Sequence, residues 1–300
     1  MTVDRSGAQL DDRQENAGLL RFLYGNAFGR ICLKLFSSRT LSRIVGAYMS
    51  SPLSKGRARR CLKRYGVRTE ELEKDRFSSF NDFFTRKKKP EFLSVESDPD
   101  LFPSPADSRV TVTRLTDGNA FPVKGAPYTV QGLLESEEEA APFRDGWAFV
   151  FRLAPSDYHR YVYPDGGTAE RSVFLPGVLH TVSPVATEKI PVFHRNCREK
   201  TLLHTDRFGT VAYVEVGAMM VGKIVNHPKE PGERFERGEE KGYFAFGGST
   251  IVVLVRNREA EPDPEILRNS LEGNETRVKL GEHVARKPAD GGRESDSFEE

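Results

Sequence analysis

The sequence predicts an α+β protein in which a helical N-terminal region precedes a mainly β core. Two patterns in the 300-residue chain support this division. Between residues 17 and 95, apolar residues recur every three to five positions, as they do along the buried face of a helix. From residue 100 to 286, short alternating runs such as 148–153 and 211–216 are typical of strands.

Polar segments flank these two regions. Residues 1–16 carry few apolar side chains, and we expect a mobile N-terminus there. Residues 287–300 are polar throughout and end in two glutamates, so they are expected to form a disordered tail. The chain therefore divides into a mobile start, a helical region over 17–95, a β-rich domain over 100–286 and a tail.

The helical region combines apolar and basic segments. Leu19, Leu23 and Ile31 belong to an apolar series between residues 19 and 36. Further on, residues 55–64 contain six cations and no anion. One interpretation is an amphipathic helix beside a basic patch, which together bind an anionic membrane surface. The other is a packed helical pair whose charges are simply solvated.

Composition excludes several classes of function. The net charge of +1 gives no basic field for nucleic acid. Cys32, Cys61 and Cys197 are far apart and odd in number, which favours unpaired thiols in a reducing compartment. The six histidines form no metal-binding pair of the H-E-x-x-H kind, so no metal is expected. No signal peptide or apolar stretch of membrane-spanning length is apparent, which indicates a cytoplasmic protein.

The segment from Gly247 to Thr250 is the strongest candidate for chemistry. It lies between residues 241–246 and the apolar run Ile251–Val255. The ordinary interpretation is a tight turn that enters a buried strand. The functional interpretation is a reactive serine, because a glycine at 248 lets the Ser249 hydroxyl approach the preceding carbonyl without a Cβ in the way.

The wider sequence favours the functional interpretation. Residues 241–250, Lys-Gly-Tyr-Phe-Ala-Phe-Gly-Gly-Ser-Thr, resemble the self-cleavage site of phosphatidylserine decarboxylases. Six further segments resemble motifs of that family in the same order, namely residues 80–90, 104–107, 123–128, 157–164, 193–196 and 216–222. The resemblance runs from about residue 80 to the Gly-Gly-Ser-Thr segment, and it implies an α+β fold with a β catalytic core.

The resemblance also implies a cofactor made from the chain itself. Ser249 would attack the carbonyl of Gly248 and convert the peptide bond to an ester. Elimination and hydrolysis would then leave a pyruvoyl group at position 249 and release ammonia. The products would be a chain of residues 1–248 and a chain of residues 249–300, which remain associated. The shorter one has 300 − 248 = 52 residues.

Candidate site residues follow from the same motifs. Ser249, His159 and Asp107 would form the catalytic group, in which the carboxylate orients the imidazole and stabilises its cation. His159 is also the candidate that returns a proton to the substrate after CO₂ leaves. Lys124 and Arg160 are weaker candidates for binding the phosphate or carboxylate of a substrate.

One position departs sharply from the family. The family has a second histidine three residues after the first, and here Val162 stands in its place. His159 or His180 would have to take over the lost role. A smaller departure puts Ser108 where the family has glycine.

Three functions therefore stay open. The first is decarboxylation of phosphatidylserine to phosphatidylethanolamine at the cytoplasmic face of a membrane. The second is decarboxylation of another amino acid by the same chemistry. The third is an unprocessed membrane-associated protein without catalysis. The sequence also leaves open whether the chain forms a homodimer.

Overall fold

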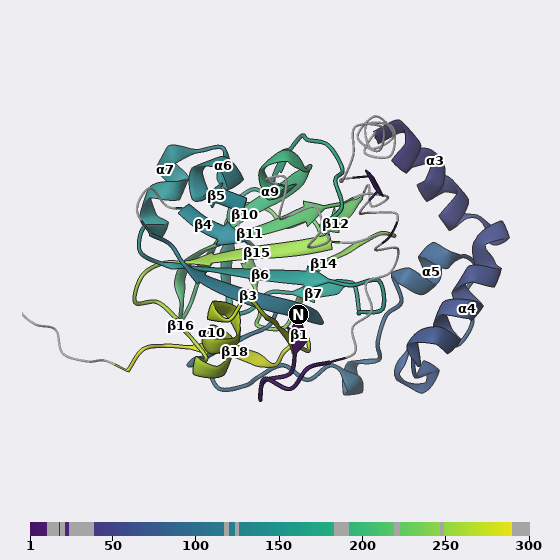
Figure 1. The fold of residues 1–300 in the computed structure, drawn as a ribbon, viewed down its shortest axis with the longest axis horizontal. Coiled ribbons are helices and arrows are strands. Elements are labelled where there is room, and N and C mark those ends of the chain that lie inside the picture. The colour runs from purple at the N-terminus through teal and green to yellow at the C-terminus, as the bar shows by residue number, and fades with distance from the viewer. Residues whose placement is uncertain are drawn as a thin grey trace, which may run out of the picture.

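The computed structural model describes residues 1–10, 18, 22–23, 39–116, 120–123, 126–182, 192–218, 223–246 and 249–289. Its architecture is α+β, as predicted, with the helices α3, α4 and α5 at one end of a large β core and other helices around it (Figure 1). Three parts of the chain discussed above lie outside the described residues. They are the candidate Lys124, Gly248 of the predicted cleavage site and most of residues 11–38. Residues 290–300, which include most of the expected tail, lie outside them as well.

A ten-stranded sheet forms the core. Nine strands follow the order β1-β17-β3-β6-β15-β11-β10-β8-β13, and β9 also pairs with β10. All pairs are antiparallel except β1 with β17. The strands are β1 (Thr2–Val3), β3 (Ser108–Arg114), β6 (Trp147–Leu153), β8 (Gly167–Ala169), β9 (Val173–Leu175), β10 (Arg198–Thr205), β11 (Gly209–Gly217), β13 (Arg234–Phe235), β15 (Ser249–Val255) and β17 (Glu275–Val278).

The strand β15 lies in the middle of this sheet, and all seven of its residues are buried. Both of its faces are covered. On one face, Tyr213 of the neighbouring β11 packs against Tyr161 of a second sheet. On the other face, Arg198 of β10 donates to backbone carbonyls of the helix α6 (Val130–Leu134). Burial on two faces explains why Ile251–Val255 is apolar without alternation.

Three smaller sheets surround the core. The second sheet has the order β12-β14-β7, and a third has the order β16-β18-β2. The remaining pair is β4 with β5. Their bounds are β2 (Leu101–Pro103), β4 (Ala120–Val123), β5 (Ala126–Thr129), β7 (Arg160–Val162), β12 (Ile224–Asn226), β14 (Glu240–Phe244), β16 (Glu261–Pro262) and β18 (His283–Arg286).

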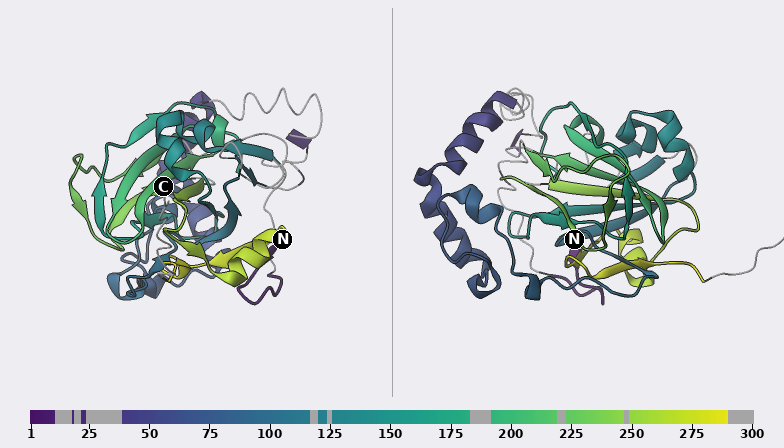
Figure 2. Two further views of the ribbon diagram at one scale, coloured as in Figure 1. Left: turned by 90° about the vertical axis from the view of Figure 1, so that its left-hand side faces the viewer. Right: turned by 180° about the vertical axis from the view of Figure 1, so that it is seen from behind.

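The views in Figures 1 and 2 show the helices α3, α4 and α5 together at one end of the sheet. The α-helices are α3 (Arg39–Ser50), α4 (Lys55–Tyr65), α5 (Phe80–Phe84), α6, α7 (Glu137–Ala140), α9 (Val192–Arg195) and α10 (Pro264–Leu271). Short 3₁₀ helices are η1 (Pro52–Ser54), η2 (Thr69–Glu71), η3 (Pro90–Phe92) and η5 (Ala141–Phe143).

The group α3–α5, here called the helical unit, has its own apolar core. That core consists of Met49, Ala58, Leu72, Phe77, Phe80, Phe83 and Phe84. Ser79 caps α5, because its hydroxyl accepts from the backbone N–H of Asp82 at 3.1 Å. Gly66 ends α4 in the left-handed conformation, with φ of 59°. Local signals thus define these short helices, and their aromatic residues join them.

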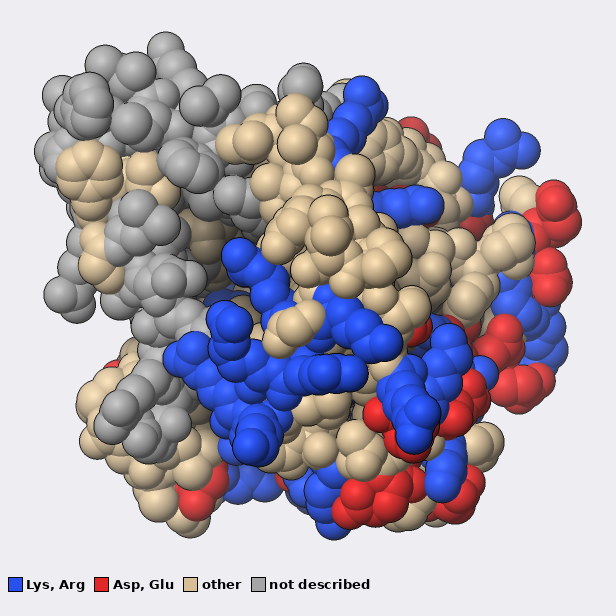
Figure 3. Space-filling view, turned by 90° about the vertical axis from the view of Figure 1, so that its right-hand side faces the viewer, with Lys and Arg blue, Asp and Glu red and all other residues tan. Residues whose placement is uncertain are grey.

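The surface of α4 is strongly basic. Figure 3 shows Lys and Arg side chains gathered on the face of the molecule that carries the helical unit. The basic face of α4 comprises the exposed residues Lys55, Arg57, Arg59, Arg60, Lys63 and Arg64. Ile44 of α3 and Leu53 of η1 are 62% and 82% exposed. The predicted basic patch is therefore a surface of α4, whereas the predicted apolar series between residues 19 and 36 lies almost entirely outside the described residues.

The N-terminus differs from the mobile segment that the sequence indicates. Thr2 and Val3 pair with β17, and both are buried. Arg5 is held by carboxylates of the C-terminal part, with Asp263 at 3.0 Å and Glu265 at 2.6 Å. A two-residue strand is too short to produce a recognisable periodicity, and its partner lies more than 270 positions away in the sequence.

Candidate active site

One end of the main sheet brings the predicted site residues into the same region. Ser249, the first residue of β15, lies opposite Leu153 on β6 and Gly217 on β11. His159 follows the end of β6, in the connection to β7. Asp107 directly precedes β3, which pairs with β6 at the same end. Strand register therefore gathers three segments that are far apart in the sequence.

Ser249 is fully buried, at 0% exposure. Its Oγ has no hydrogen-bond partner among the residues that the structure describes. Residues directly opposite each other in an antiparallel pair share a face, and Gly217 contributes no side chain there. A buried hydroxyl without a partner is costly in a finished structure, and it fits a group that has still to react with the preceding peptide bond.

His159 is also fully buried, and its two ring nitrogens differ. Nδ1 lies 3.0 Å from the carbonyl oxygen of Asp157. Because a carbonyl can only accept, Nδ1 carries the hydrogen and Nε2 keeps a lone pair. Nε2 has no hydrogen-bond partner within the described part of the chain. The ring is therefore oriented by the backbone, with its basic nitrogen unengaged there.

Burial lowers the pKa of His159 to about 3, and the charges of Arg86 and Arg109 act in the same direction. The imidazole is consequently neutral at physiological pH. It can accept a proton at Nε2, although so low a pKa makes it a weak base.

His159 contacts the segment that leads to the predicted cleavage site. Its carbonyl accepts from the backbone N–H of Phe244 at 3.0 Å. Its ring lies against Phe84, with centroids 3.9 Å apart. Phe84 in turn meets the ring of Phe246 edge to face at 5.6 Å. Phe246 is three residues before Ser249, so these contacts connect the histidine to the cleavage segment.

Asp107 lies at the same strand end but makes other contacts. Its Oδ1 accepts from the backbone N–H of Leu280 at 2.8 Å, and its Oδ2 is 3.5 Å from Nζ of Lys88. The Nδ1 of His159 faces the carbonyl of Asp157 instead. The structure therefore brings Asp107 to the region of the predicted catalytic group, while the backbone supplies the orienting contact to the histidine.

Val162 occupies a different environment from His159. It is 4% exposed and packs in a small apolar cluster with Tyr158 and Leu280. Leu280 is the residue whose N–H binds Asp107. Position 162 therefore lies on the side of Asp107, whereas His159 lies on the side of Phe84.

Two charged residues of the 157–164 motif have structural roles. The carboxylate of Asp157 pairs with Arg109 and accepts from the backbone N–H of Ala154 at 2.7 Å, which fixes the connection after β6. Arg160, predicted as a substrate contact, binds Glu240 at 2.6 Å and the carbonyl of Thr85 at 2.9 Å. Its guanidinium joins the end of α5 to β14.

His180, the other candidate base, is buried near the same strand end. Asn196 accepts from its backbone N–H at 2.9 Å and donates to its carbonyl at 2.8 Å. The same amide donates to the carbonyl of Gly217 at 2.7 Å. Burial lowers the pKa of His180 to about 4, and the charge of Arg195 contributes. Asn196 thus ties the His180 backbone to the residue opposite Ser249.

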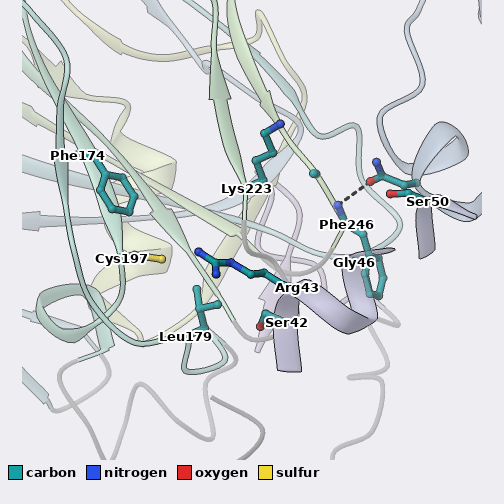
Figure 4. A pocket seen from close by; sticks show the side chains of 11 residues that line it. Ser42, Arg43, Gly46, Ser50, Phe174, Leu179, Cys197, Lys223 and Phe246 are labelled. Carbon is teal, nitrogen blue, oxygen red and sulfur yellow. Dashed lines mark hydrogen bonds between the residues drawn. The ribbon is translucent and has the colours of Figure 1, made fainter. Parts of the chain in front are cut away.

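A pocket of about 540 Å³ opens beside the cleavage segment, between α3 and the strand end. Figure 4 shows side chains from several segments arranged around it. Its apolar lining includes Phe174, Leu179 and Phe246, and its cations are Arg43 and Lys223. Sequence reasoning missed both cations, because neither belongs to a motif with a chemical signature and tertiary folding alone brings them together.

The described residues contain no group of three or more histidine, cysteine, aspartate or glutamate side chains placed to hold a metal ion. Several buried side-chain atoms at this strand end have no hydrogen-bond partner among the described residues, and the hydroxyls of Ser108 and Thr250 are two of them. Two others are the hydroxyl of Ser249 and Nε2 of His159. They fit proton transfer and a cofactor made from Ser249.

Comparisons with known proteins give a consistent result. A family model described as phosphatidylserine decarboxylase matches residues 80–286. The chain is 38% identical over 274 residues to phosphatidylserine decarboxylase proenzyme 2 of Clostridium acetobutylicum, covering 91% of this chain and 93% of the relative. It is 36% identical over 287 residues to the phosphatidylserine decarboxylase proenzyme of Ruminiclostridium cellulolyticum, covering 94% and 95%.

Proposed function

The chain belongs to the phosphatidylserine decarboxylase family, and we propose that it cleaves itself between Gly248 and Ser249 and then converts phosphatidylserine to phosphatidylethanolamine and CO₂. The observation that carries the proposal is the buried hydroxyl of Ser249, which has no hydrogen-bond partner among the described residues and lies at the strand end that also holds His159. The names of these relatives describe proenzymes, which accords with a processing step.

In the proposed cleavage, the Oγ of Ser249 attacks the carbonyl carbon of Gly248. Nε2 of His159 takes the hydroxyl proton and returns it to the leaving amide nitrogen, so that an ester replaces the peptide bond. Loss of the Cα hydrogen of residue 249 then expels the Gly248 carboxylate, and hydrolysis releases ammonia. At position 249, the resulting pyruvoyl group would supply the electron-accepting carbonyl that decarboxylation of an amino acid requires.

The pocket beside Phe246 is the proposed substrate site. Arg43 and Lys223 suit the phosphate of the lipid, since charge-assisted hydrogen bonds to phosphate are short and strong. Phe174 and Leu179 suit the less polar part of the lipid next to the headgroup. These two cations replace Lys124 and Arg160 as the candidates that we favour for binding the phosphate.

We also propose that the helical unit rests on the cytoplasmic leaflet of a membrane. The six cations of the basic face of α4 would each contribute about 1 kcal/mol near anionic lipids. Ile44 lies on α3, and the same helix supplies Arg43 to the pocket. A membrane bound there would therefore lie next to the substrate site. Among the described helices, none has the length and apolar character needed to cross a bilayer.

The experiment that tests this function compares two substrates. The purified protein is incubated with vesicles containing phosphatidylserine labelled at the carboxylate, and separately with labelled free serine. We expect labelled CO₂ and phosphatidylethanolamine from the vesicles, and no labelled CO₂ from serine. Ser249→Ala serves as the control, because alanine cannot give a pyruvoyl group. Release from free serine alone would support the second function, and release from neither substrate would contradict decarboxylation.

A further inference from the structure

The segment that leads to the proposed cleavage site is held by hydrogen bonds from three successive backbone N–H groups. Phe244 donates to the carbonyl of His159 and Ala245 donates to the carbonyl of Lys223, both at 3.0 Å. Phe246 donates to Oδ1 of Asn81, also at 3.0 Å. The acceptors come from three separate segments. The contact at Phe246 is the last before the Gly-Gly pair and the only one of the three that a side chain supplies.

The helix α5 makes a second contact with the same residue. Phe80 meets the ring of Phe246 edge to face, with centroids 5.0 Å apart, and Phe84 meets it at 5.6 Å. Asn81 lies between these two aromatic residues in the sequence. One face of α5 therefore holds both the backbone and the side chain of Phe246.

We propose that Asn81 is a positioning residue for self-cleavage, through its hydrogen bond to the N–H of Phe246. The inference rests on the proposed cleavage at Gly248. Attack by a hydroxyl requires the target carbonyl to stay near the attacking atom in one orientation. Glycine restricts the backbone less than other residue types do, so a cleavage site preceded by a Gly-Gly pair needs a fixed point directly before that pair. Asn81 supplies that point from the helical unit.

A matched set of variants tests the role of the acceptor. Asn81→Leu keeps the approximate size and removes the acceptor, whereas Asn81→Asp keeps an acceptor oxygen. The control is Asn257→Leu, the same change at an exposed position beyond the other end of β15. Each full chain is made by cell-free synthesis, and the appearance of the two products is followed with time. A net hydrogen-bond contribution of ordinary size predicts cleavage roughly three- to tenfold slower in Asn81→Leu.

We expect Asn81→Leu to cleave slowly. The cleavage rates of Asn81→Asp and Asn257→Leu should lie within about twofold of the native rate, a difference smaller than the loss of one hydrogen bond would cause. Native rates for Asn81→Leu, or equal slowing in Asn81→Asp, would overturn the proposal. If Asn81→Leu lacks a cooperative thermal transition, Asn81→Ala takes its place under the same criteria.

A second readout does not depend on cleavage. In the Ser249→Ala background, hydrogen exchange at the Phe246 amide should be faster with Asn81→Leu than with Asn81→Asp. Equal exchange in both would overturn the inference. If the native chain does not cleave but the exchange rates differ, the contact is present and the proposed function is what fails.

Discussion

The ring of His159 packs against the ring of Phe84, with centroids 3.9 Å apart and ring planes inclined by 35°. The contact excludes water from the imidazole and explains why burial is the main cause of its low pKa, about 3. It also sets the histidine beside the helix that holds Phe246. A residue at the end of one strand is thus coupled to the helical unit and to the cleavage segment.

The low pKa of His159 predicts how stability changes with pH. The imidazole titrates near 6.5 when unfolded and near 3 when folded, so the unfolded state binds the proton first. The stability contributed by the neutral ring is complete above pH 6.5 and is lost as pH falls from 6.5 towards 3. We expect a slope of about 1.4 kcal/mol per pH unit from this group within that window. Urea unfolding of the Ser249→Ala variant at several pH values between about 4 and 7 measures this slope.

The matched variant for that experiment is Ser249→Ala combined with His159→Gln, which removes the titrating group and keeps a single chain. Its free energy of unfolding should depend less steeply on pH below 6.5. Parallel curves for the two proteins would show that His159 is not the group responsible.

Asp107→Asn should slow self-cleavage by roughly tenfold or more, because the variant lacks the negative charge that stabilises a protonated histidine nearby. The amide can still accept from the N–H of Leu280, so the fold should persist. A time course of chain cleavage checks the rate, and thermal unfolding checks the fold. A normal cleavage rate would show that Asp107 has no role in cleavage beyond its structural contacts to Leu280 and Lys88.

Val162→His should accelerate self-cleavage. Position 162 packs against Leu280 on the side of Asp107, so a histidine there would have a carboxylate within reach. A well-placed base contributes about 10²–10⁴-fold, and His159 is a weak one. His159→Ala should abolish self-cleavage in the native background. In the Val162→His background, the same substitution should reduce the cleavage rate by a smaller factor. If His159→Ala cleaves at the native rate, the base is elsewhere and His180 is the next residue to replace.

Reversing charges on the basic face of α4 should weaken binding to anionic vesicles. Arg59→Glu combined with Lys63→Glu removes two cations, at about 1 kcal/mol each, and predicts affinity lower by about 30-fold or more. The control is Arg268→Glu with Arg277→Glu, two exposed positions on α10 and β17. Vesicle sedimentation at low and high salt measures both proteins. Equal loss in the two variants would contradict a specific role for α4.

The sequence predicted the parts of this fold that depend on local pattern and on motif order. The β core, the helices between residues 39 and 84 and the place of Ser249 at the start of an apolar strand all follow from neighbouring residues. The pocket could not be predicted, because Arg43 and Lys223 are 180 positions apart and meet only through tertiary packing. The same reason applies to Arg160, whose partner Glu240 lies on another strand. Periodicity indicates which residues are buried and leaves strand order undetermined.

The central claim is that Ser249 becomes the blocked first residue of a separate chain. Intact mass spectrometry of the denatured native protein tests it most directly. The prediction is two chains, residues 1–248 and residues 249–300, the second lighter by one ammonia than a chain that begins with serine. Ser249→Ala should give one chain of 33.7 kDa. A native protein of one uncleaved chain, or a short chain that begins with an unmodified serine, would contradict the account.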